Sequence, residues 1–404
     1  MNDKGNTILL VDDNKTNIKV LVSTLESHGF RTATARSGEM GIRRAEFSRP
    51  DLILLDVMMP GIDGFETCRR LKANEKTGDI PVIFMTALND MENKLIGFEV
   101  GGVDYITKPF EEAEVMARVK THLTLRHTQR QLSRSLGEIT DSIRYAERIQ
   151  RSLLPNSDEV RAYLPDSFFL WMPRDIVGGD IYFAERFGDG IIVAVIDCTG
   201  HGVPGAFMSM IASSFIRRIT TTFNCHDPAE ILKQLNQVVK TSLQQDRKDA
   251  VSDDGLDAAV CFIEVEGGDE SSCPLSAPSR VIFAGAKLPL FYVRNREVNV
   301  IKGDRQSIGY KRSDPDFEFT NHVIPVESGI SFYLSTDGFW DQMREDAGSR
   351  FGFRTFGRKR FKKLLAEISS LPFDMQQERL VEAFRTYKGE MRRQDDVTVA
   401  GFGF

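Results

Sequence analysis

The chain has 404 residues, of which 41% are hydrophobic, and its formal net charge is −6. This length predicts two or three globular domains, and the mildly acidic charge disfavours a broad nucleic-acid-binding face. The five cysteines show no paired spacing, and no apolar run approaches the roughly 20 residues of a membrane helix. We therefore expect a cytoplasmic protein with no disulfide framework, no nucleic-acid partner and no membrane contact.

Residues 1–121 are expected to form an N-terminal domain in which short apolar runs alternate with segments of helical periodicity. The runs ILLV, LILL, PVIFM and DYIT are typical of buried parallel strands. This alternation predicts an α/β fold with a doubly wound sheet. Such sheets bind ligands outside the carboxyl ends of their strands.

Polar side chains follow each of these four strands. Asp12 and Asp13 follow the first strand, Asp56 the second, Thr86 the third and Lys108 the fourth. Clustered carboxylates repel one another, so they need a hard divalent cation with oxygen ligands, such as Mg²⁺. Lys108 adds a positive charge, and the Thr86 hydroxyl can bond a phosphoryl oxygen. A carboxylate held in this way can act as a nucleophile toward phosphate.

These motifs resemble those of the CheY-like receiver family. The resemblance is carried by LLVDD, DVMMPGIDGFE (56–66), the Thr86–Ala87 step and ITKPF (106–110). It implies a flavodoxin-like fold and a sensor histidine kinase as partner. The site residues that it implies are the phosphoacceptor Asp56, the magnesium ligands Asp12, Asp13, Asp56 and the Met58 carbonyl, the switch pair Thr86 and Tyr105, and the cation Lys108.

Residues 122–155 are predicted to form a helical linker that ends at Pro155. Its apolar side chains fall at the a and d spacings of a heptad, with Gln129 and Gln150 at the remaining a positions. These side chains are Leu125, Leu132, Leu136, Ile139, Ile143, Ala146 and Leu153. We expect a coiled coil that pairs two copies into a homodimer, the alternative being a helix packed on its own domain.

Residues 156–404 are predicted to form a second α/β domain, with a β-sandwich core flanked by helices. The strand-like segments are WMP, IYFAER, IIVAVID, DAAVCFIEV, RVIFAGA, LFYV, VNVI, ISFYLSTDG and DVTVAGFGF. Helical segments are expected at roughly 205–222, 228–245, 354–370 and 375–391.

Acidic residues of this second domain lie where strands meet turns. Asp180 lies in VGGDIYF, Asp197 in AVIDCTGHGVPG, Asp337 in LSTDGFWD, and Asp395 and Asp396 in QDDVTVAGF. Separated aspartates without a histidine or cysteine cluster fit an all-oxygen site for Mg²⁺ or Mn²⁺. Two such ions suit the hydrolysis of phosphate monoesters, which is among the slowest uncatalysed reactions.

The order and spacing of these motifs resemble the SpoIIE-like bacterial branch of the protein phosphatase 2C family. The supporting segments, within 150–404, are IQRSLLP, PRDIVGGD, DCTGHGVPGAFMSM, FAGAKLPLF, QSIGY, STDGFWD and DDVTV. The resemblance implies a serine/threonine phosphatase with two ions of Mn²⁺ or Mg²⁺. The ligands that it implies are Asp180, Asp197, the Cys198 carbonyl, Asp337 and Asp395.

Several roles in this domain stay open at the level of sequence. The position of Asp395 in its motif favours it over Asp396 as a ligand, without excluding Asp396. His201 is a candidate general acid, although its GHG setting serves turn geometry equally well. An outer metal is within reach of Asp253, Asp254 or Asp257. The phosphate-binding arginine of the eukaryotic enzymes has no clear counterpart.

The two resemblances together predict a response regulator in which phosphorylation of Asp56 controls the phosphatase through the linker helix. Relatives in this branch act on phosphoserine in anti-sigma-factor antagonists within partner-switching pathways, which implies a substrate of that kind. A catalytically silent adaptor is the main alternative, but it should have lost metal aspartates. A diguanylate cyclase is disfavoured because GGDIYF departs from GGDEF, and a DNA-binding regulator because no basic helix-turn-helix is present.

Overall fold

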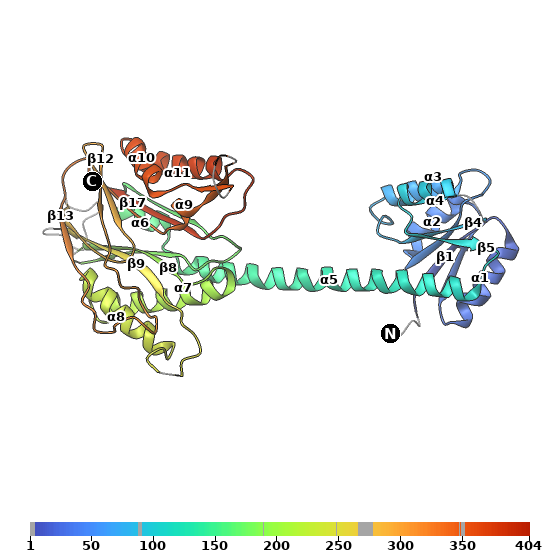
Figure 1. The fold of residues 1–404 in the computed structure, drawn as a ribbon, viewed down its shortest axis with the longest axis horizontal. Coiled ribbons are helices and arrows are strands. Elements are labelled where there is room, and N and C mark those ends of the chain that lie inside the picture. Colours follow the sequence, from blue (N-terminus) through green and yellow to red (C-terminus); the bar gives the residue numbers. More distant parts are fainter. Residues whose placement is uncertain are drawn as a thin grey trace. The chain divides into compact units, whose positions relative to one another are not determined.

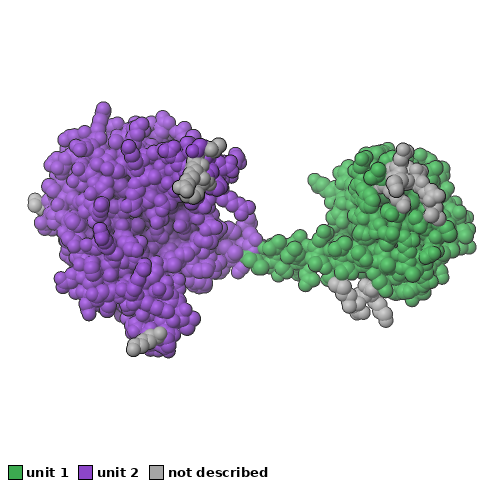
Figure 2. Space-filling view, in the orientation of Figure 1, with its two compact units in different colours: residues 1–139 green, residues 140–404 purple. Residues whose placement is uncertain are grey.

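The computed structural model describes residues 5–87, 91–188, 190–247, 249–265, 278–346, 348 and 352–404, with the backbone alone for 91–94. Figure 1 shows the helices and strands, and Figure 2 shows two compact units, residues 1–139 and 140–404. None of the described helices is both long enough and apolar enough to cross a bilayer.

Unit 1 contains a five-stranded parallel sheet with the strand order β2-β1-β3-β4-β5. Its strands are β1 (Thr7–Val11), β2 (Arg31–Ala35), β3 (Leu52–Asp56), β4 (Val82–Ala87) and β5 (Asp104–Lys108). Its helices are α1 (Lys15–Ser27), α2 (Gly38–Ser48), α3 (Gly64–Ala73), α4 (Met91–Glu99) and the first part of α5 (Glu112–Leu153). This arrangement confirms the predicted doubly wound fold.

Helices cover both faces of this sheet, which explains why its strands are apolar without alternation. Successive residues of a strand point to opposite faces. In β1, Ile8 and Leu10 belong to the core on the side of α1 and α5. Leu9 and Val11 belong to the core on the side of α2 and α3.

Helix α5 is longer than the predicted linker, because it also includes the last helix of the receiver unit. It runs without interruption for 42 residues. Its first turns contribute Val115 and Val119 to the receiver core. Farther along, Arg126 is buried and donates hydrogen bonds to the carbonyl oxygens of Pro50 and Asp51. The linker is therefore a direct continuation of the receiver.

Unit 2 contains two five-stranded sheets, with strand orders β13-β10-β9-β8-β7 and β12-β11-β14-β17-β6. The strands of the first sheet are β7 (Ile181–Phe187), β8 (Gly190–Cys198), β9 (Leu256–Val265), β10 (Pro278–Ala286) and β13 (His322–Pro325). Those of the second are β6 (Ser167–Met172), β11 (Leu290–Arg294), β12 (Glu297–Ile301), β14 (Ser331–Ser335) and β17 (Val397–Gly403). The short strands β15 (Met343–Glu345) and β16 (Phe353–Thr355) form a separate two-stranded sheet.

The two sheets pack face to face and helices cover their outer faces, so the predicted sandwich flanked by helices is confirmed. Figure 1 shows α7 and α8 on one side and α10 and α11 on the other. The helices of this unit are α6 (Ser157–Tyr163), α7 (Gly202–Arg217), followed by a π-helical turn (Arg218–Thr222), α8 (Pro228–Ser242), α9 (Gly338–Asp341), α10 (Arg358–Ile368) and α11 (Phe373–Lys388). In β8, Val193 faces the second sheet while Ala194 faces α7 and α8.

Candidate functional site

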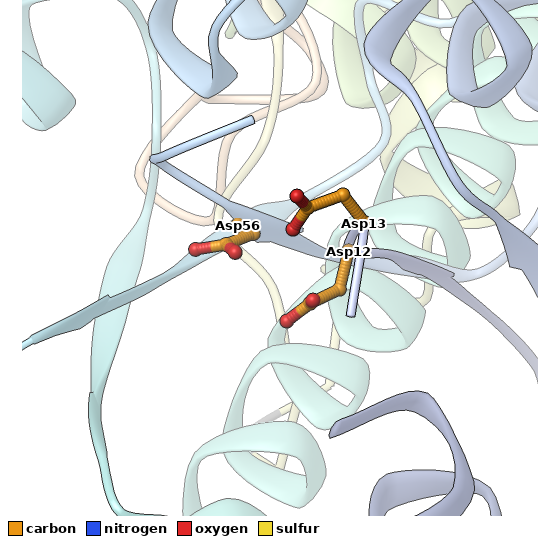
Figure 3. Close-up of side chains that lie close together, drawn as sticks. All are labelled: Asp12, Asp13 and Asp56. Atoms are coloured by element: carbon orange, nitrogen blue, oxygen red, sulfur yellow. The ribbon is translucent and has the colours of Figure 1, made fainter. Parts of the chain in front are cut away.

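Three aspartates gather at the carboxyl end of the receiver sheet (Figure 3). Asp12 and Asp13 follow β1, and Asp56 is the last residue of the adjacent strand β3. Each offers a carboxylate oxygen, and these oxygens lie within 4.8 Å of one another. Such a set of hard oxygen donors fits a single divalent cation. The amide of Met58, whose carbonyl was predicted as a further ligand, donates to Asp56 Oδ1 at 3.4 Å.

Lys108 partly neutralises this cluster from β5. Its Nζ lies 2.8 Å from Asp56 Oδ2 and 3.0 Å from Asp12 Oδ2. Burial raises the pKa of Asp56, and the nearby charge of Asp12 raises it further, while Lys108 lowers it. A cation bound here favours the ionised carboxylate in the same way as Lys108, and the ionised form is the nucleophile toward a phosphodonor.

Thr86 and Tyr105, the predicted switch pair, lie on neighbouring strands. Both line one small pocket, together with Phe98. The Thr86 hydroxyl donates a long bond of 3.4 Å to the carbonyl oxygen of Ala87. The guanidinium of Arg118 lies 5.1 Å from the centre of the Tyr105 ring. The two side chains therefore share a pocket, and their role as a switch stays a prediction.

The predicted aspartates of unit 2 come from four separate segments. Asp180 immediately precedes β7, Asp197 lies at the end of β8, Asp337 follows β14, and Asp395 precedes β17. They are close enough to influence one another electrostatically. Burial raises the pKa of Asp197 well above its usual range, and the charges of the other three carboxylates raise it further.

The surroundings of these carboxylates have the chemistry of a cation site. Asp180 is only 2% exposed and accepts a hydrogen bond from the Thr336 hydroxyl at 2.7 Å. Burial, reinforced by Asp396, raises its pKa well above the usual range. Burial and nearby carboxylates likewise raise the pKa of Asp337 to about 6. Buried like charges of this kind are stabilised in their ionised form by divalent cations.

These four carboxylates are nevertheless more widely spaced than those of the receiver. In the described part of the chain, the receiver trio is the acidic group whose ligand atoms all lie within 4.8 Å of one another. A single ion at an ordinary Mg²⁺ distance therefore could not contact three of the unit 2 aspartates as they are placed. The binding of two ions by these residues stays a prediction.

The backbone of the GGD segment packs tightly against the end of β8. A Cβ added to Gly179 would lie 2.8 Å from the Cys198 carbonyl oxygen and 2.5 Å from that of Gly200. Only glycine permits this approach. It brings Asp180 close to the Cys198 carbonyl, which was predicted as a ligand.

Asp395 and Asp396 have different surroundings. The buried Asp396 carboxylate accepts hydrogen bonds from the amides of Arg174, at 2.5 Å, and Gly179, at 2.6 Å. The Asp395 side chain is exposed, and its Oδ1 accepts a bond from the Asp396 amide at 2.9 Å. Asp396 thus holds the loop that leads to Asp180, whereas the exposed carboxylate of Asp395 keeps oxygen lone pairs available for a cation.

His201 forms a pair that sequence patterns did not predict. Its Nδ1 lies 2.9 Å from Asp175 Oδ2, and both side chains are about half exposed. His201 is also the N-cap residue of α7 but makes no side-chain capping bond. The ring is therefore oriented by a carboxylate and makes no side-chain capping bond, and its role as a general acid stays a prediction.

Asp257 stands out among the three candidates for an outer ion. It lies directly opposite Asp197 in the β8–β9 pairing, and its buried Oδ1 has no hydrogen-bond partner among the described residues. Burial raises its pKa. Asp253 instead accepts a hydrogen bond from the Lys311 amide at 2.9 Å. The spacing of Asp257 from the other motifs could not reveal this contact, which depends on strand register.

Gln150 was predicted only as a polar heptad position, and the structure gives it a different place. It is 1% exposed. Its Nε2 donates to the Gly178 carbonyl at 2.6 Å and to the Ser209 hydroxyl at 2.7 Å, and its Oε1 accepts from the Gly178 amide at 3.2 Å. Gln150 therefore holds the GGD segment to α5 and α7. Its position within IQRSLLP was the available signal.

Comparisons with known proteins match both units. Residues 8–120 match the response regulator receiver domain model, and residues 188–402, just over half of the chain, match that of Stage II sporulation protein E (SpoIIE). A similar solved structure is the SiaA-PP2C domain of Pseudomonas aeruginosa. The two are 35% identical, with a TM-score of 0.57, over 67% of this chain and 98% of that one.

Curated relatives match over a shorter length. The DNA-binding dual master transcriptional regulator RpaA of Synechocystis sp. is 42% identical over 123 residues, which are 30% of this chain and 50% of that protein. The phosphate regulon transcriptional regulatory protein PhoB of Pseudomonas aeruginosa is 44% identical over 119 residues, which are 30% of this chain and 52% of that protein. The chain thus spans about half the length of these relatives. It belongs to the SpoIIE family, with a response regulator receiver domain joined to a domain of the protein phosphatase 2C type.

Proposed function

We propose that this protein is a response regulator in which phosphorylation of Asp56 controls a metal-dependent protein serine/threonine phosphatase. The observation that carries the proposal is the presence of two separate acidic centres in one chain. The first is the Asp12, Asp13 and Asp56 trio with Lys108 beside it. The second is the set of mutually repelling carboxylates around Asp197.

Each centre has residues suited to hold its ions. In the receiver, Asp12, Asp13, Asp56 and the Met58 carbonyl would bind Mg²⁺. In the phosphatase unit, Asp180, Asp197, the Cys198 carbonyl, Asp337 and Asp395 would hold two ions of Mn²⁺ or Mg²⁺. Asp396 is left out of this set because its carboxylate is engaged by backbone amides. Such ions polarise the phosphoryl group and promote attack by water.

The protein residues supply the remaining steps. His201, oriented by Asp175, would donate a proton to the serine oxygen as the phosphate ester bond breaks. The glycines of the GGD segment let the backbone approach the reacting centre closely. Thr336 holds Asp180 in a fixed direction through its hydroxyl.

Helix α5 is the element best placed to connect the two activities. Its middle section carries a row of exposed apolar side chains, which suits pairing with a second copy in a homodimer. These are Leu125, Leu132, Leu136 and Ile139, all 52–59% exposed. Near its end, the Gln150 side chain is hydrogen-bonded to the backbone of Gly178 in the GGD segment. A change of about 100-fold in activity requires only about 2.7 kcal/mol of differential stabilisation between two states.

The proposed partners follow from the same family membership. A sensor histidine kinase would supply the phosphoryl group to Asp56. The substrate would be a phosphoserine protein of the kind that acts as an anti-sigma-factor antagonist in partner switching. The cation-binding carboxylates are compatible with any phosphoserine segment that reaches them, so substrate identity depends on surfaces outside this cluster.

The test is hydrolysis of p-nitrophenyl phosphate and of a phosphoserine peptide by the full chain with Mn²⁺. Rates are compared with and without beryllofluoride, which mimics the phosphoryl group on Asp56. We expect the rate to change with beryllofluoride in the wild type and not in Asp56→Asn. Asp337→Asn should abolish hydrolysis while leaving the receiver able to bind beryllofluoride.

Two outcomes would contradict the proposal in different ways. A rate of hydrolysis that changes neither with beryllofluoride nor with Asp56→Asn would indicate a phosphatase without receiver control. Absence of hydrolysis with Mn²⁺ and also with Mg²⁺, with or without beryllofluoride, would favour the catalytically silent adaptor.

A further inference from the structure

An open pocket of about 570 Å³ lies beside the phosphatase carboxylates. Asp257 and Asp337 form part of its wall. The same wall carries four cationic side chains, which we call the basic rim: Lys287, Lys302, Arg305 and Arg358. All four are exposed. This concentration of positive charge contrasts with the net charge of −6 of the chain.

Two loops are locked together to form the basic rim. The Lys287 amide donates to the Asp304 carbonyl at 2.8 Å, and the Asp304 amide donates to the Gly285 carbonyl at 2.7 Å. A Cβ at Gly303 would lie 2.6 Å from the Leu288 carbonyl oxygen, so the loops can approach this closely only with glycine there. The rim is therefore built on hydrogen-bonded backbone rather than on a free loop.

The backbone of Lys287 is held in an uncommon conformation. Its φ is +62°, in the left-handed region that non-glycine residues seldom adopt. Such conformations persist where the surrounding structure fixes them, and they are frequent at binding sites. The result is that the lysine side chain emerges beside Asp257, whose pKa it lowers against the effect of burial.

Against the effect of burial, which raises the pKa of the nearby Asp257 and Asp337 carboxyls, Lys287 and Arg358 respectively lower it. None of the four side chains of the basic rim, however, forms an ion pair with a carboxylate in the described part of the chain. The nearby Asp304 carboxylate accepts bonds from the amide and hydroxyl of Thr320. Arg358 lies over the Trp340 ring at 5.0 Å, which orients it while leaving its guanidinium donors available.

We infer that the basic rim binds the phosphorylated segment of an acidic protein substrate. Lys287 and Arg358 line the same pocket as Asp257 and Asp337, so in this inference they contact the phosphoryl oxygens. Lys302 and Arg305 line the same pocket and in this inference bind carboxylates that flank the phosphoserine. Cations of this kind form strong charge-assisted hydrogen bonds with phosphate and carboxylate. This inference rests on the proposed phosphatase activity and gives it a substrate preference.

The experiment compares two phosphoserine peptides that differ only in having Glu or Gln on both sides of the phosphoserine. Full-length protein with Mn²⁺ is used, and kcat/KM is measured for each peptide. The variants are Lys302→Gln with Arg305→Gln, and Arg358→Gln alone. Lys363→Gln is the matched control, because it removes the same charge from α10 at a position outside the pocket lining.

The wild type should prefer the Glu peptide by about tenfold, since a charge-assisted hydrogen bond contributes about that factor. The Lys302→Gln, Arg305→Gln variant should lose this preference through KM. Arg358→Gln should lower kcat/KM for both peptides about tenfold or more, and Lys363→Gln should match the wild type. A retained preference in the double variant, or an equal loss in Lys363→Gln, would overturn the inference.

A binding measurement separates this inference from the phosphatase proposal. A fluorescent Glu peptide that carries a non-hydrolysable phosphonate in place of phosphate is titrated with each protein, and its anisotropy is followed. Weaker binding by the double variant supports the basic rim even if hydrolysis is absent. Hydrolysis by the wild type combined with unchanged binding in every variant would refute the rim alone.

Discussion

Asp395 and Asp396 are neighbours in sequence, but their side chains differ in burial and in partners. Asp396 is 3% exposed and accepts two backbone amide bonds. We expect Asp396→Ala to lower the free energy of unfolding by about 2–4 kcal/mol, because it leaves buried amides without an acceptor. Asp395→Asn should change stability by less than about 0.5 kcal/mol and weaken Mn²⁺ binding. Urea denaturation in EDTA and calorimetric titration with Mn²⁺ measure the two effects.

The opposite pattern would assign the metal ligand to Asp396. If Asp396→Asn, which keeps one acceptor oxygen, weakened Mn²⁺ binding as much as Asp395→Asn at unchanged stability, its amide bonds would be incidental.

Asp337 makes the stability of the metal-free protein depend on pH. Its pKa is raised from 3.8 to about 6 in the folded chain. The folded state therefore holds more protons than the unfolded state between these values, and stability is lost as the pH rises through them. We expect Asp337→Asn in EDTA to be more stable than the wild type by about 1–3 kcal/mol near neutral pH. The difference should shrink as the pH falls below about 6, and urea denaturation across pH measures it.

Mn²⁺ should reverse this order, because the ion compensates the carboxylate charge that the variant lacks. Asp249→Asn, at an exposed position outside the cluster, is the control and should show neither effect. A pH-independent difference between wild type and Asp337→Asn would contradict the raised pKa.

At the scale of elements, α5 has two sections with different surroundings. Leu136 and Ile139 are exposed, whereas Gln150 is buried within unit 2. The predicted heptad therefore remains available for pairing only in its middle section. We expect Leu136→Lys to convert a dimer into a monomer, because a charge at an a position opposes the apolar seam. Light scattering after size-exclusion chromatography measures the mass.

Asp141→Lys is the control for this change. Asp141 is exposed on the same helix but lies outside the a and d positions. It introduces the same side chain, so it should leave the mass unchanged. A wild type that is monomeric at every concentration would remove the dimer from the proposed function.

Elements with a strong local pattern were predictable from the sequence, and weakly patterned ones were not. The apolar run of β8 predicted a strand, as found, and the structure buries that strand on both faces. The strand β2 has the sequence RTATA, with no apolar run, and it lies at the edge of its sheet. The backbone hydrogen bonds of its pairing with β1 stabilise this strand, although its sequence alone does not predict it. The short helix α6 was missed for the same reason.

Some contacts of the candidate sites were likewise predictable from the sequence, and others were not. The receiver residues follow strands of one parallel sheet, so strand order alone predicts that Asp12 and Asp56 meet. Asp257 meets Asp197 only through antiparallel register between β8 and β9. The loops of the basic rim meet through backbone bonds between 285–288 and 303–304. Contacts of this kind depend on tertiary pairing, which a single sequence does not specify.

At the scale of the whole molecule, the proposed control requires one continuous element to reach both activities. Near its start, helix α5 contributes Val115 to the receiver core, and near its end Gln150 bonds Gly178 and Ser209. We propose that a helix attached at both ends biases a two-state element, so that no separate signalling pathway is needed. In this proposal, the bonds of Gln150 are the point at which the receiver state alters the position of Asp180.

Gln150→Met tests this coupling with little change of volume. Methionine fills the site but cannot bond the Gly178 carbonyl and amide or the Ser209 hydroxyl. We expect hydrolysis of p-nitrophenyl phosphate to fall about tenfold or more, and the response to beryllofluoride to disappear. Gln131→Met, exposed on the same helix, should keep both. If Gln150→Met lowered the rate but kept the full response to beryllofluoride, Gln150 would only position the GGD segment. Receiver control would then have to reach the phosphatase through another contact of α5.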